Sequence, residues 1–206
     1  MGTVKSLLLG MCFVLGACTS QTSTVQTTEK GTRWEWQNGT IVVKTPERPA
    51  GQKSVLGLTT PKLEAVRVGF VGLGMRGPGA VERFTYIPGT QVVALCDYEE
   101  ARADKCQELL KKASMPKAAV YSGDKGYEEL CKRDDIDLVY IAADWLHHFP
   151  VAKCALENGK KVAIEVPSAM NLQECWDLIN LSESTRKHCF ILENCCYDWF
   201  EMNTLN

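Results

Sequence analysis

The stretch V-R-V-G-F-V-G-L-G-M-R-G, residues 66–77, joins a short apolar run to three glycines with the spacing G-x-G-x-x-G. In a strand–turn–helix unit, Gly72 would permit a tight turn, Gly74 would let the backbone approach a pyrophosphate, and Gly77 would let the helix pack close to the strand. The first amides of that helix would face the phosphates. Because the spacing alone also fits an ordinary glycine-rich turn, the rest of the chain has to decide between the two interpretations.

Apolar runs and helical patterns alternate without a break after Val66. We expect six strands, at residues 66–71, 91–96, 118–121, 137–142, 161–166 and 189–193. Five helices separate them. The fourth is expected to begin near Pro150, and the fifth, from Asn171, to turn four side chains toward the core: Leu172, Cys175, Leu178 and Ile179. This alternation predicts an α/β fold with a doubly wound, parallel, six-stranded Rossmann sheet.

Ligands of such sheets bind beyond the carboxyl ends of the strands, where the strand order reverses. Asp97 ends the second strand, 20 residues after Gly77. A carboxylate there would accept hydrogen bonds from the adenosine ribose and would repel a 2′-phosphate, so the pattern favours NAD over NADP. A strand-end aspartate that caps a helix is the alternative. Arg76, inside the glycine loop, is placed to neutralise a phosphate.

The first residues have the pattern of an export signal. Lys5 precedes an apolar run, residues 7–17, that is too short to span a bilayer. Leu15-Gly16-Ala17-Cys18 then resembles the lipobox of bacterial lipoproteins, in which the signal is cut before a cysteine that becomes lipidated. We expect a signal peptide at 1–17, then a tether and irregular arm at 18–64 with one strand at 40–43. The product would be an exported bacterial lipoprotein of the periplasm or cell envelope, anchored at Cys18; an ordinary secretory signal is the alternative.

Composition limits the partners. The 206 residues include 23 basic and 25 acidic side chains, a formal charge of −2, and no basic stripe with interleaved aromatics, so we expect a small-molecule partner and no nucleic acid. Ten cysteines are present, but without C-x-x-C pairs or histidine clusters at ligand spacing, so we expect no metal site. Most are expected in the core, in apolar segments: Cys96, Cys106, Cys131, Cys154, Cys175 and Cys189. Homo-oligomerisation is left open.

Two loops resemble those of the Gfo/Idh/MocA oxidoreductases. I-A-A-D-W-L-H-H, residues 141–148, follows the fourth strand, and Glu165-Val166-Pro167 follows the fifth. The resemblance implies a dinucleotide domain followed by an α/β substrate domain. Members of that family commonly have Glu-Lys-Pro at the second loop, with the lysine near the reacting carbon. Val166 stands in its place, and an apolar side chain cannot shuttle a proton.

Four motifs together are similar to glycoside hydrolase family 109, the NAD-dependent α-N-acetylgalactosaminidases: G-L-G-M-R-G, D-W-L-H-H, E-V-P and, at 193–197, E-N-C-C-Y. The resemblance covers about residues 55–206. It implies cofactor contacts from Met75, Arg76, Asp97, Trp145, Leu146, His147, His148, Glu165, Val166 and Asn194. It also implies that NAD takes a hydride from C3 of a terminal sugar, that elimination expels the aglycone, and that water addition and hydride return complete the hydrolysis.

The resemblance implies that residues 65–194 form the NAD-binding domain and that residues 195–206 begin the connection to a substrate domain missing from this chain. The sugar-binding and proton-transfer residues are therefore unknown, and His148 is the only acid/base candidate that can be named. A sugar dehydrogenase of the wider family, or an inactive NAD-binding fragment, are the alternatives to a glycosidase.

Overall fold

The computed structural model describes residues 26–27, 33–43 and 46–204, which fall into two units, 1–44 and 45–206. Cys18 and residues 1–17, where an export signal is expected, lie outside the described residues. The first unit contains three antiparallel strands, β1 (Gln26–Thr27), β2 (Arg33–Gln37) and β3 (Thr40–Val43). Asn38 and Gly39 both have positive φ, which is typical of the two-residue turn of a β-hairpin. The strand expected at 40–43 is therefore confirmed.

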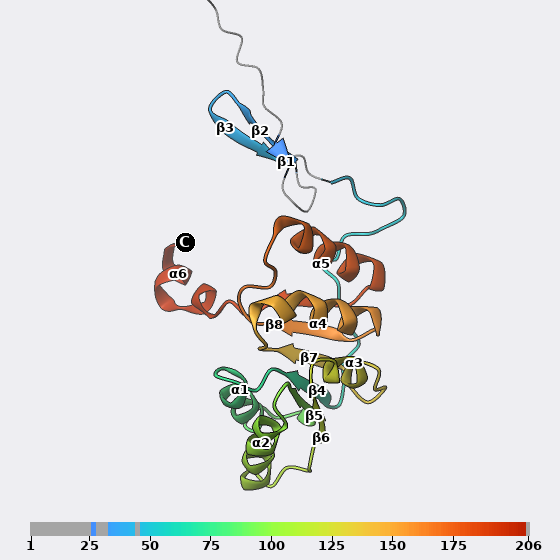
Figure 1. Cartoon of the computed structure of the whole chain (residues 1–206), viewed down its shortest axis with the longest axis vertical. Helices are drawn as coiled ribbons and strands as arrows, with labels where there is room; N and C mark the ends of the chain where they lie inside the picture. Colours follow the sequence, from blue (N-terminus) through green and yellow to red (C-terminus); the bar gives the residue numbers. More distant parts are fainter. Residues whose placement is uncertain (1–25, 28–32, 44–45, 205–206) are drawn as a thin grey trace, which may run out of the picture. The chain divides into compact units, whose positions relative to one another are not determined.

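The second unit is built on one parallel sheet (Figure 1). Its strands lie in the order β6 (Ala119–Ser122), β5 (Thr90–Asp97), β4 (Val66–Val71), β7 (Leu138–Ile141), β8 (Lys161–Ile164) and β9 (Cys189–Ile191). The order reverses between β4 and β7, as in doubly wound dinucleotide-binding sheets. The six-stranded parallel sheet expected from the sequence is confirmed, although β8 and β9 each end two residues before their expected ends.

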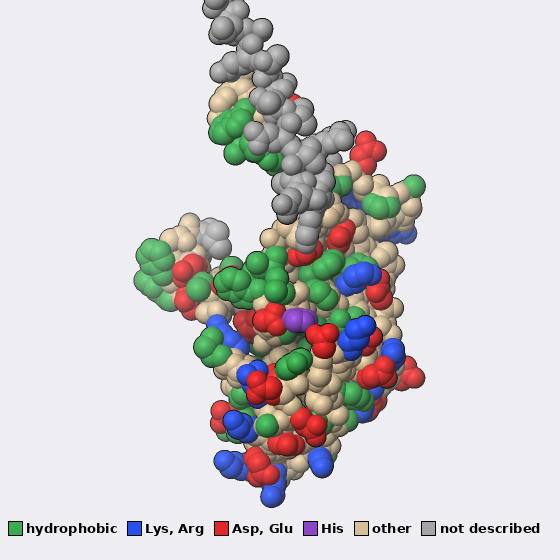
Figure 2. Space-filling view, viewed as in Figure 1, with side chains coloured by type: hydrophobic (Ala, Val, Ile, Leu, Met, Phe, Trp, Pro, Cys, Tyr) green, Lys and Arg blue, Asp and Glu red, His purple; other side chains and the backbone are tan. Residues whose placement is uncertain are grey.

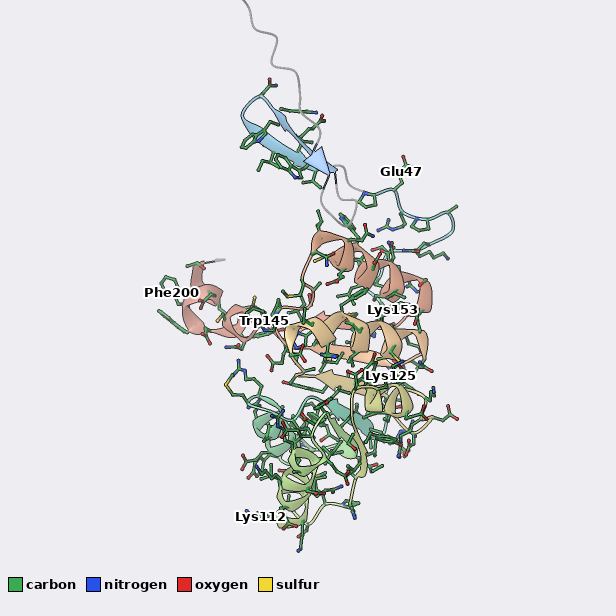
Figure 3. The ribbon with its side chains drawn as sticks, in the orientation of Figure 1. Glu47, Lys112, Lys125, Trp145, Lys153 and Phe200 are labelled. Atoms are coloured by element: carbon green, nitrogen blue, oxygen red, sulfur yellow. The ribbon has the colours of Figure 1, made fainter. Side chains whose placement is uncertain are left out.

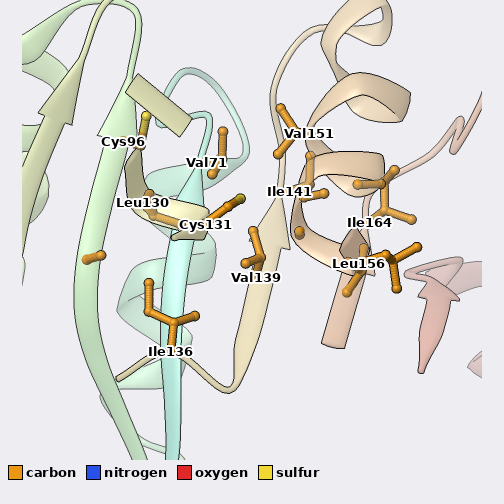
Figure 4. Close-up of a cluster of buried hydrophobic side chains, with 14 of the residues drawn as sticks. Val71, Cys96, Leu130, Cys131, Ile136, Val139, Ile141, Val151, Leu156 and Ile164 are labelled. Atoms are coloured by element: carbon orange, nitrogen blue, oxygen red, sulfur yellow. The ribbon is translucent and has the colours of Figure 1, made fainter. Parts of the chain in front are cut away.

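Helices cover both faces of the sheet because alternate strand residues point to opposite sides. Phe70 points to the face covered by α1 (Gly77–Phe84) and α2 (Glu100–Lys112). Val71 points to the face covered by α3 (Gly126–Cys131), α4 (Trp145–Glu157) and α5 (Leu172–Thr185). Figure 4 shows this second core, where Val139, Ile141 and Ile164 of the sheet meet side chains from α3 and α4. Each core fixes the strand ends that carry the site.

Two expectations about helices are wrong. Helix α4 begins at Trp145, five residues before Pro150, because the Asp144 side chain accepts hydrogen bonds from the Leu146 and His147 amides and caps the helix there. On α5, only Leu178 of the four side chains expected in the core is buried, whereas Leu172, Cys175 and Ile179 are exposed. The face of the helix that packs on the sheet is therefore narrower than the run of apolar residues in the sequence. The expected start of α5 is confirmed, since the Asn171 side chain accepts from the Glu174 amide at 3.1 Å.

Residues 48–58 lie against α5 and the chain that follows it. Arg48 donates two hydrogen bonds to the Glu183 carboxylate, at 2.9 and 3.0 Å, and Gln52 donates a third at 2.9 Å. His188 Nε2 lies 2.9 Å from the carbonyl oxygen of Leu58. The Arg48 guanidinium lowers the pKa of Glu183, which is 3% exposed. These contacts hold residues 48–58 on the domain.

The chain beyond the sheet forms a short 3₁₀ helix, η1 (Asn194–Tyr197), and then α6 (Trp199–Thr204). Tyr197, Trp199 and Phe200 on these two elements are all more than two-thirds exposed. Among the helices that the structure describes, none combines the length and apolar character needed to cross a bilayer.

Candidate cofactor site

A cavity of about 810 Å³ opens where the carboxyl ends of the central strands meet. This volume is within the range of small-molecule and cofactor sites. The loop after β4, the end of β5, the start of α4 and the loop after β8 all contribute to its lining. The cavity therefore occupies the point where the strand order reverses.

The glycine loop forms the cavity's central wall. Gly72 has φ +91°, and a Cβ atom there would lie 2.3 Å from the backbone nitrogen of Ala143. A Cβ at Gly77 would lie 2.2 Å from the Gly72 carbonyl oxygen. At Gly74, by contrast, the nearest atom would be Arg102 Nη1 at 3.7 Å. Gly72 and Gly77 are thus required by the fold itself, whereas Gly74 leaves open space on the cavity side.

Helix α1 presents its N-terminus at this loop. Arg76 is the N-cap residue and makes no side-chain capping hydrogen bond. The first amides of a helix have no intrahelical partner, so an uncapped N-terminus suits an anion such as a pyrophosphate. The open space at Gly74 and this uncapped helix end together fit the phosphates of a dinucleotide.

Asp97, at the end of β5, is 6% exposed and holds the glycine loop in place. Its Oδ2 accepts a hydrogen bond from the Leu73 amide at 2.6 Å, and its Oδ1 accepts one from the Glu99 amide at 2.9 Å. Arg102 on α2 reaches Oδ1 at 3.3 Å and also donates to Glu99 Oε1 at 3.0 Å. The carboxylate that was expected to bind a ribose therefore also joins the ends of two strands.

The start of α4 carries an aspartate–histidine pair. His147 Nδ1 lies 2.6 Å from Asp144 Oδ2, and its Nε2 lies 3.7 Å from Asp124 Oδ1. Burial opposes the charge of Asp144, but the hydrogen bonds from the His147 ring and from the Leu146 and His147 amides outweigh it, so its pKa is lowered. Asp144 is thus an ionised cap that also orients His147 at the cavity wall.

His148 joins two loops of the site. The ring is 1% exposed, with Nδ1 2.6 Å from the carbonyl oxygen of Pro167 and Nε2 2.9 Å from that of Ala143. Both ring nitrogens are therefore engaged by backbone oxygens. This arrangement suits a brace between the loops after β7 and β8, and it does not favour the acid/base role, which stays a prediction.

The loop after β8 supplies Glu165 and Val166. Glu165 Oε1 accepts a hydrogen bond from the Tyr140 hydroxyl at 2.8 Å. Val166 is 45% exposed, lines the cavity and precedes a cis peptide bond to Pro167. The position where the resemblance to the oxidoreductases would place a lysine thus offers only an apolar surface to the cavity.

Eleven of the thirteen cofactor residues expected from the sequence line the cavity: Gly72, Gly74, Met75, Arg76, Asp97, Trp145, His147, His148, Glu165, Val166 and Asn194. Trp145 stands at the N-terminal end of α4 (Figure 3). The other two, Gly77 and Leu146, are outside the lining: Gly77 packs behind the loop and Leu146 is 74% exposed. Whether each lining residue touches a cofactor stays a prediction.

Sequence reasoning missed several residues of the cavity wall, among them Tyr98, Arg102, Asp124, Tyr127 and Glu193. Three of these had a readable signal: Tyr98 follows Asp97 directly, Arg102 lies in the first turn of α2, and Glu193 opens the E-N-C-C-Y motif. Asp124 and Tyr127 come from the segment after β6, and no motif marked them.

Charged side chains of both signs are interspersed on the face shown in Figure 2. Within residues 26–27, 33–43 and 46–204, no group of three His, Cys, Asp or Glu side chains is arranged to hold a metal ion. The cavity lining combines the backbone of the glycine loop and the guanidiniums of Arg76 and Arg102 with carboxylates such as Asp97 and Glu165. Groups of these kinds bind the phosphates and the ribose hydroxyls of a dinucleotide.

Comparison with known proteins supports this interpretation. The chain is 81% identical over 207 residues to glycosyl hydrolase family 109 protein 4 of Phocaeicola vulgatus, with 100% of this chain and 40% of that protein covered. It is 57% identical to family 109 protein 1 of Bacteroides thetaiotaomicron, with 98% of this chain and 42% of that protein covered. The chain thus spans about two-fifths of the length of these relatives.

The fold is also found in solved structures. Myo-inositol dehydrogenase from Lactobacillus casei, in complex with NAD(H) and myo-inositol, matches with a TM-score of 0.58 and 23% identity, over 68% of this chain and 42% of that one. The Gfo/Idh/MocA family model, described as "Oxidoreductase family, NAD-binding Rossmann fold", matches residues 66–192. The match covers the sheet and its glycine loop together with the loops that line the cavity, and the chain therefore belongs to the Gfo/Idh/MocA oxidoreductase family.

Proposed function

We propose that this chain is the cofactor domain of an exported, NAD-dependent glycosidase that hydrolyses terminal α-N-acetylgalactosaminides. The observation that carries the proposal is the cavity at the strand-order reversal, which combines an open glycine loop with one carboxylate at the end of β5 and another after β8. The names of the family 109 relatives support a hydrolase over a dehydrogenase. The sugar site would lie in the three-fifths of those relatives that this chain does not match.

The proposal gives a task to the main polar groups of the cavity. The amides at the start of α1 and Arg76 hold the pyrophosphate, Asp97 accepts from the adenosine ribose, and Glu165 accepts from the nicotinamide half. NAD, when bound, supplies a hydride acceptor and donor for reversible oxidation of the sugar. Val166 cannot move a proton, and both ring nitrogens of His148 face carbonyl oxygens. The acid/base groups are therefore expected outside this chain.

The test uses the full-length gene product with a chromogenic α-N-acetylgalactosaminide, while product release and NADH absorbance are followed together. Release that depends on NAD and leaves no net NADH is the expected result. Accumulation of NADH without glycoside cleavage would instead indicate a sugar dehydrogenase. An NAD-loaded protein that cleaves no α- or β-glycoside would contradict the proposal.

We propose NAD rather than NADP as the cofactor. Asp97 lines the adenosine end of the cavity, and the Arg102 guanidinium beside it is already paired with the carboxylates of Asp97 and Glu99, so the local charge disfavours a 2′-phosphate. Calorimetric titration should give a clearly lower Kd for NAD than for NADP. Equal affinity for the two would refute this part of the proposal.

We also propose lipid anchoring at Cys18, on the basis of Leu15-Gly16-Ala17-Cys18. Replacement Cys18→Ser should move the protein from the membrane fraction to the soluble fraction, while Cys12→Ser, within the signal itself, should not. Unchanged membrane association of the Cys18 variant would count against the anchor.

A further inference from the structure

A tyrosine stands in the middle of the buried sheet, where parallel strands usually carry aliphatic side chains. Tyr140 of β7 is 6% exposed. Its ring stacks on Phe70, with centroids 5.1 Å apart, and meets the edge of Phe84 at 5.8 Å. These two aromatic contacts fix the ring, so the direction of its hydroxyl is set by the core.

The hydroxyl links the core to the cavity. It donates to Glu165 Oε1 at 2.8 Å, across the gap between β7 and β8. Burial, and then the Glu165 carboxylate, raise the pKa of Tyr140 to about 12, while a hydrogen bond from Arg83 on α1 opposes that rise. The hydroxyl therefore keeps its proton at neutral pH and can only donate toward Glu165. A buried tyrosine hydroxyl usually finds such a partner.

Only one of the two carboxylate oxygens of Glu165 accepts a hydrogen bond from the described residues. A carboxylate has two oxygens that each accept up to two hydrogen bonds. Tyr140 occupies Oε1, and no group among the described residues donates to Oε2. Because Glu165 lines the cavity, this second oxygen is available to a ligand.

The position of Glu165 identifies the part of the ligand that it would meet. Glu165 follows β8, on the opposite side of the glycine loop from Asp97 on β5. If the pyrophosphate lies at the glycine loop and the adenosine on the β5 side, the nicotinamide nucleoside lies on the β8 side. That nucleoside offers hydrogen-bond donors in its ribose hydroxyls and its carboxamide.

We infer that Tyr140 is a positioning residue: its buried hydroxyl fixes the Glu165 carboxylate so that Oε2 accepts a hydrogen bond from the nicotinamide nucleoside. The inference rests on the proposed NAD site. Tyr140 would affect the binding of only the nicotinamide half of the cofactor. A residue that contributed to stability alone would have no such selective effect.

The substitution Tyr140→Phe keeps the stacked ring and removes only the hydroxyl. Calorimetric titrations of the full-length protein with NAD and with ADP separate the two halves of the site, because ADP lacks the nicotinamide nucleoside. We expect Tyr140→Phe to weaken NAD binding about 5- to 30-fold, the range for one lost, well-placed hydrogen bond, and to change ADP binding less than about twofold. Glu165→Gln should weaken NAD binding selectively too, and the double variant should be no weaker than Glu165→Gln alone.

Tyr121→Phe is the matched control, since the Tyr121 hydroxyl accepts from Arg133 at 3.2 Å and Tyr121 does not line the cavity. It should leave both affinities within about twofold of the wild type. Equal losses for NAD and ADP in Tyr140→Phe, or no loss for NAD, would overturn the inference. A wild-type protein that binds ADP and NAD equally would also overturn it, whereas one that binds neither would refute the proposed cofactor site itself.

Discussion

The three glycines of the cavity loop should respond differently to alanine. Gly72→Ala places a side chain at φ +91°, which costs about 1–3 kcal/mol for a non-glycine residue. The new Cβ would also lie 2.3 Å from the Ala143 nitrogen and 2.4 Å from the Ala142 carbonyl carbon. Relief of such an overlap requires backbone shifts that cost about 1–3 kcal/mol more. Because 1 kcal/mol lowers the Tm of a domain of this size by about 2–4 °C, we expect Gly72→Ala to melt about 5–20 °C below the wild type.

Gly74→Ala should show the opposite behaviour. Its Cβ would meet only Arg102 Nη1, at an ordinary contact distance of 3.7 Å, so the Tm should change by less than about 2 °C. The Cβ would, however, occupy space on the cavity side, where the pyrophosphate is expected to approach the backbone. Affinity for NAD should therefore fall about 10- to 100-fold, which corresponds to the cost of a one-methyl overlap.

Thermal melts followed by circular dichroism, and calorimetric titrations with NAD, test both substitutions. Gly79→Ala is the control within α1: its Cβ would lie 3.6 Å from Arg83 Nη1, and an alanine there favours the helix, so Tm should rise slightly and NAD affinity should stay the same. A Gly72→Ala variant that melts with the wild type would refute the steric reasoning. A Gly74→Ala variant that binds NAD normally would refute the placement of the pyrophosphate.

Three further predictions concern the domain itself. Hydrogen bonds from Arg67 lower the pKa of Asp137 below its ordinary 3.8. The stability that this pair contributes is therefore complete above pH 3.8 and is lost as the pH falls through the lower pKa of the folded state. Thermal melts between pH 6 and pH 3 should show a smaller loss of Tm for Asp137→Asn than for the wild type. Burial raises the pKa of Cys96 to about 12. Its thiol should therefore resist a disulfide reagent at pH 8 in the folded protein, whereas the exposed Cys175 should react. Equal labelling of the two cysteines in mass spectrometry would contradict this. Arg48→Ala leaves the buried Glu183 carboxylate of α5 without its guanidinium and should lower the Tm without changing NAD affinity. A change in that affinity would indicate that the effect of residues 48–58 reaches the site.

The sheet could be predicted from the sequence because each strand is a short apolar run between turn residues, and that signal is local. The start of α4 could not, because two local signals conflict there. Pro150 suits a first helical turn, whereas Asp144 caps the helix through its side chain, and only the cap sets the start. The consequence is functional: Trp145, His147 and His148 belong to the first turn of a helix, which fixes their directions.

Contacts between distant segments left no signal in the sequence. Arg48 and Glu183 are 135 residues apart, and nothing local marks either as the other's partner. The same applies to Tyr140 and Glu165, which pair only because β7 and β8 are neighbours in the sheet. The residues that hold the site therefore required the structure, whereas the motifs that line it did not.

The two interpretations of Asp97, ribose acceptor and structural cap, describe different parts of one carboxylate. Its two oxygens offer about four acceptor positions. The Glu99 amide and Arg102 occupy two of them on Oδ1, and the Leu73 amide occupies one on Oδ2. One position on Oδ2 therefore remains for a ribose hydroxyl. A second hydroxyl would have to displace Arg102, whose contact is the longest of the three at 3.3 Å and whose side chain also has Glu99 as a partner. Asp97 can thus hold the glycine loop and accept a ribose at the same time, with Arg102 as the group that moves.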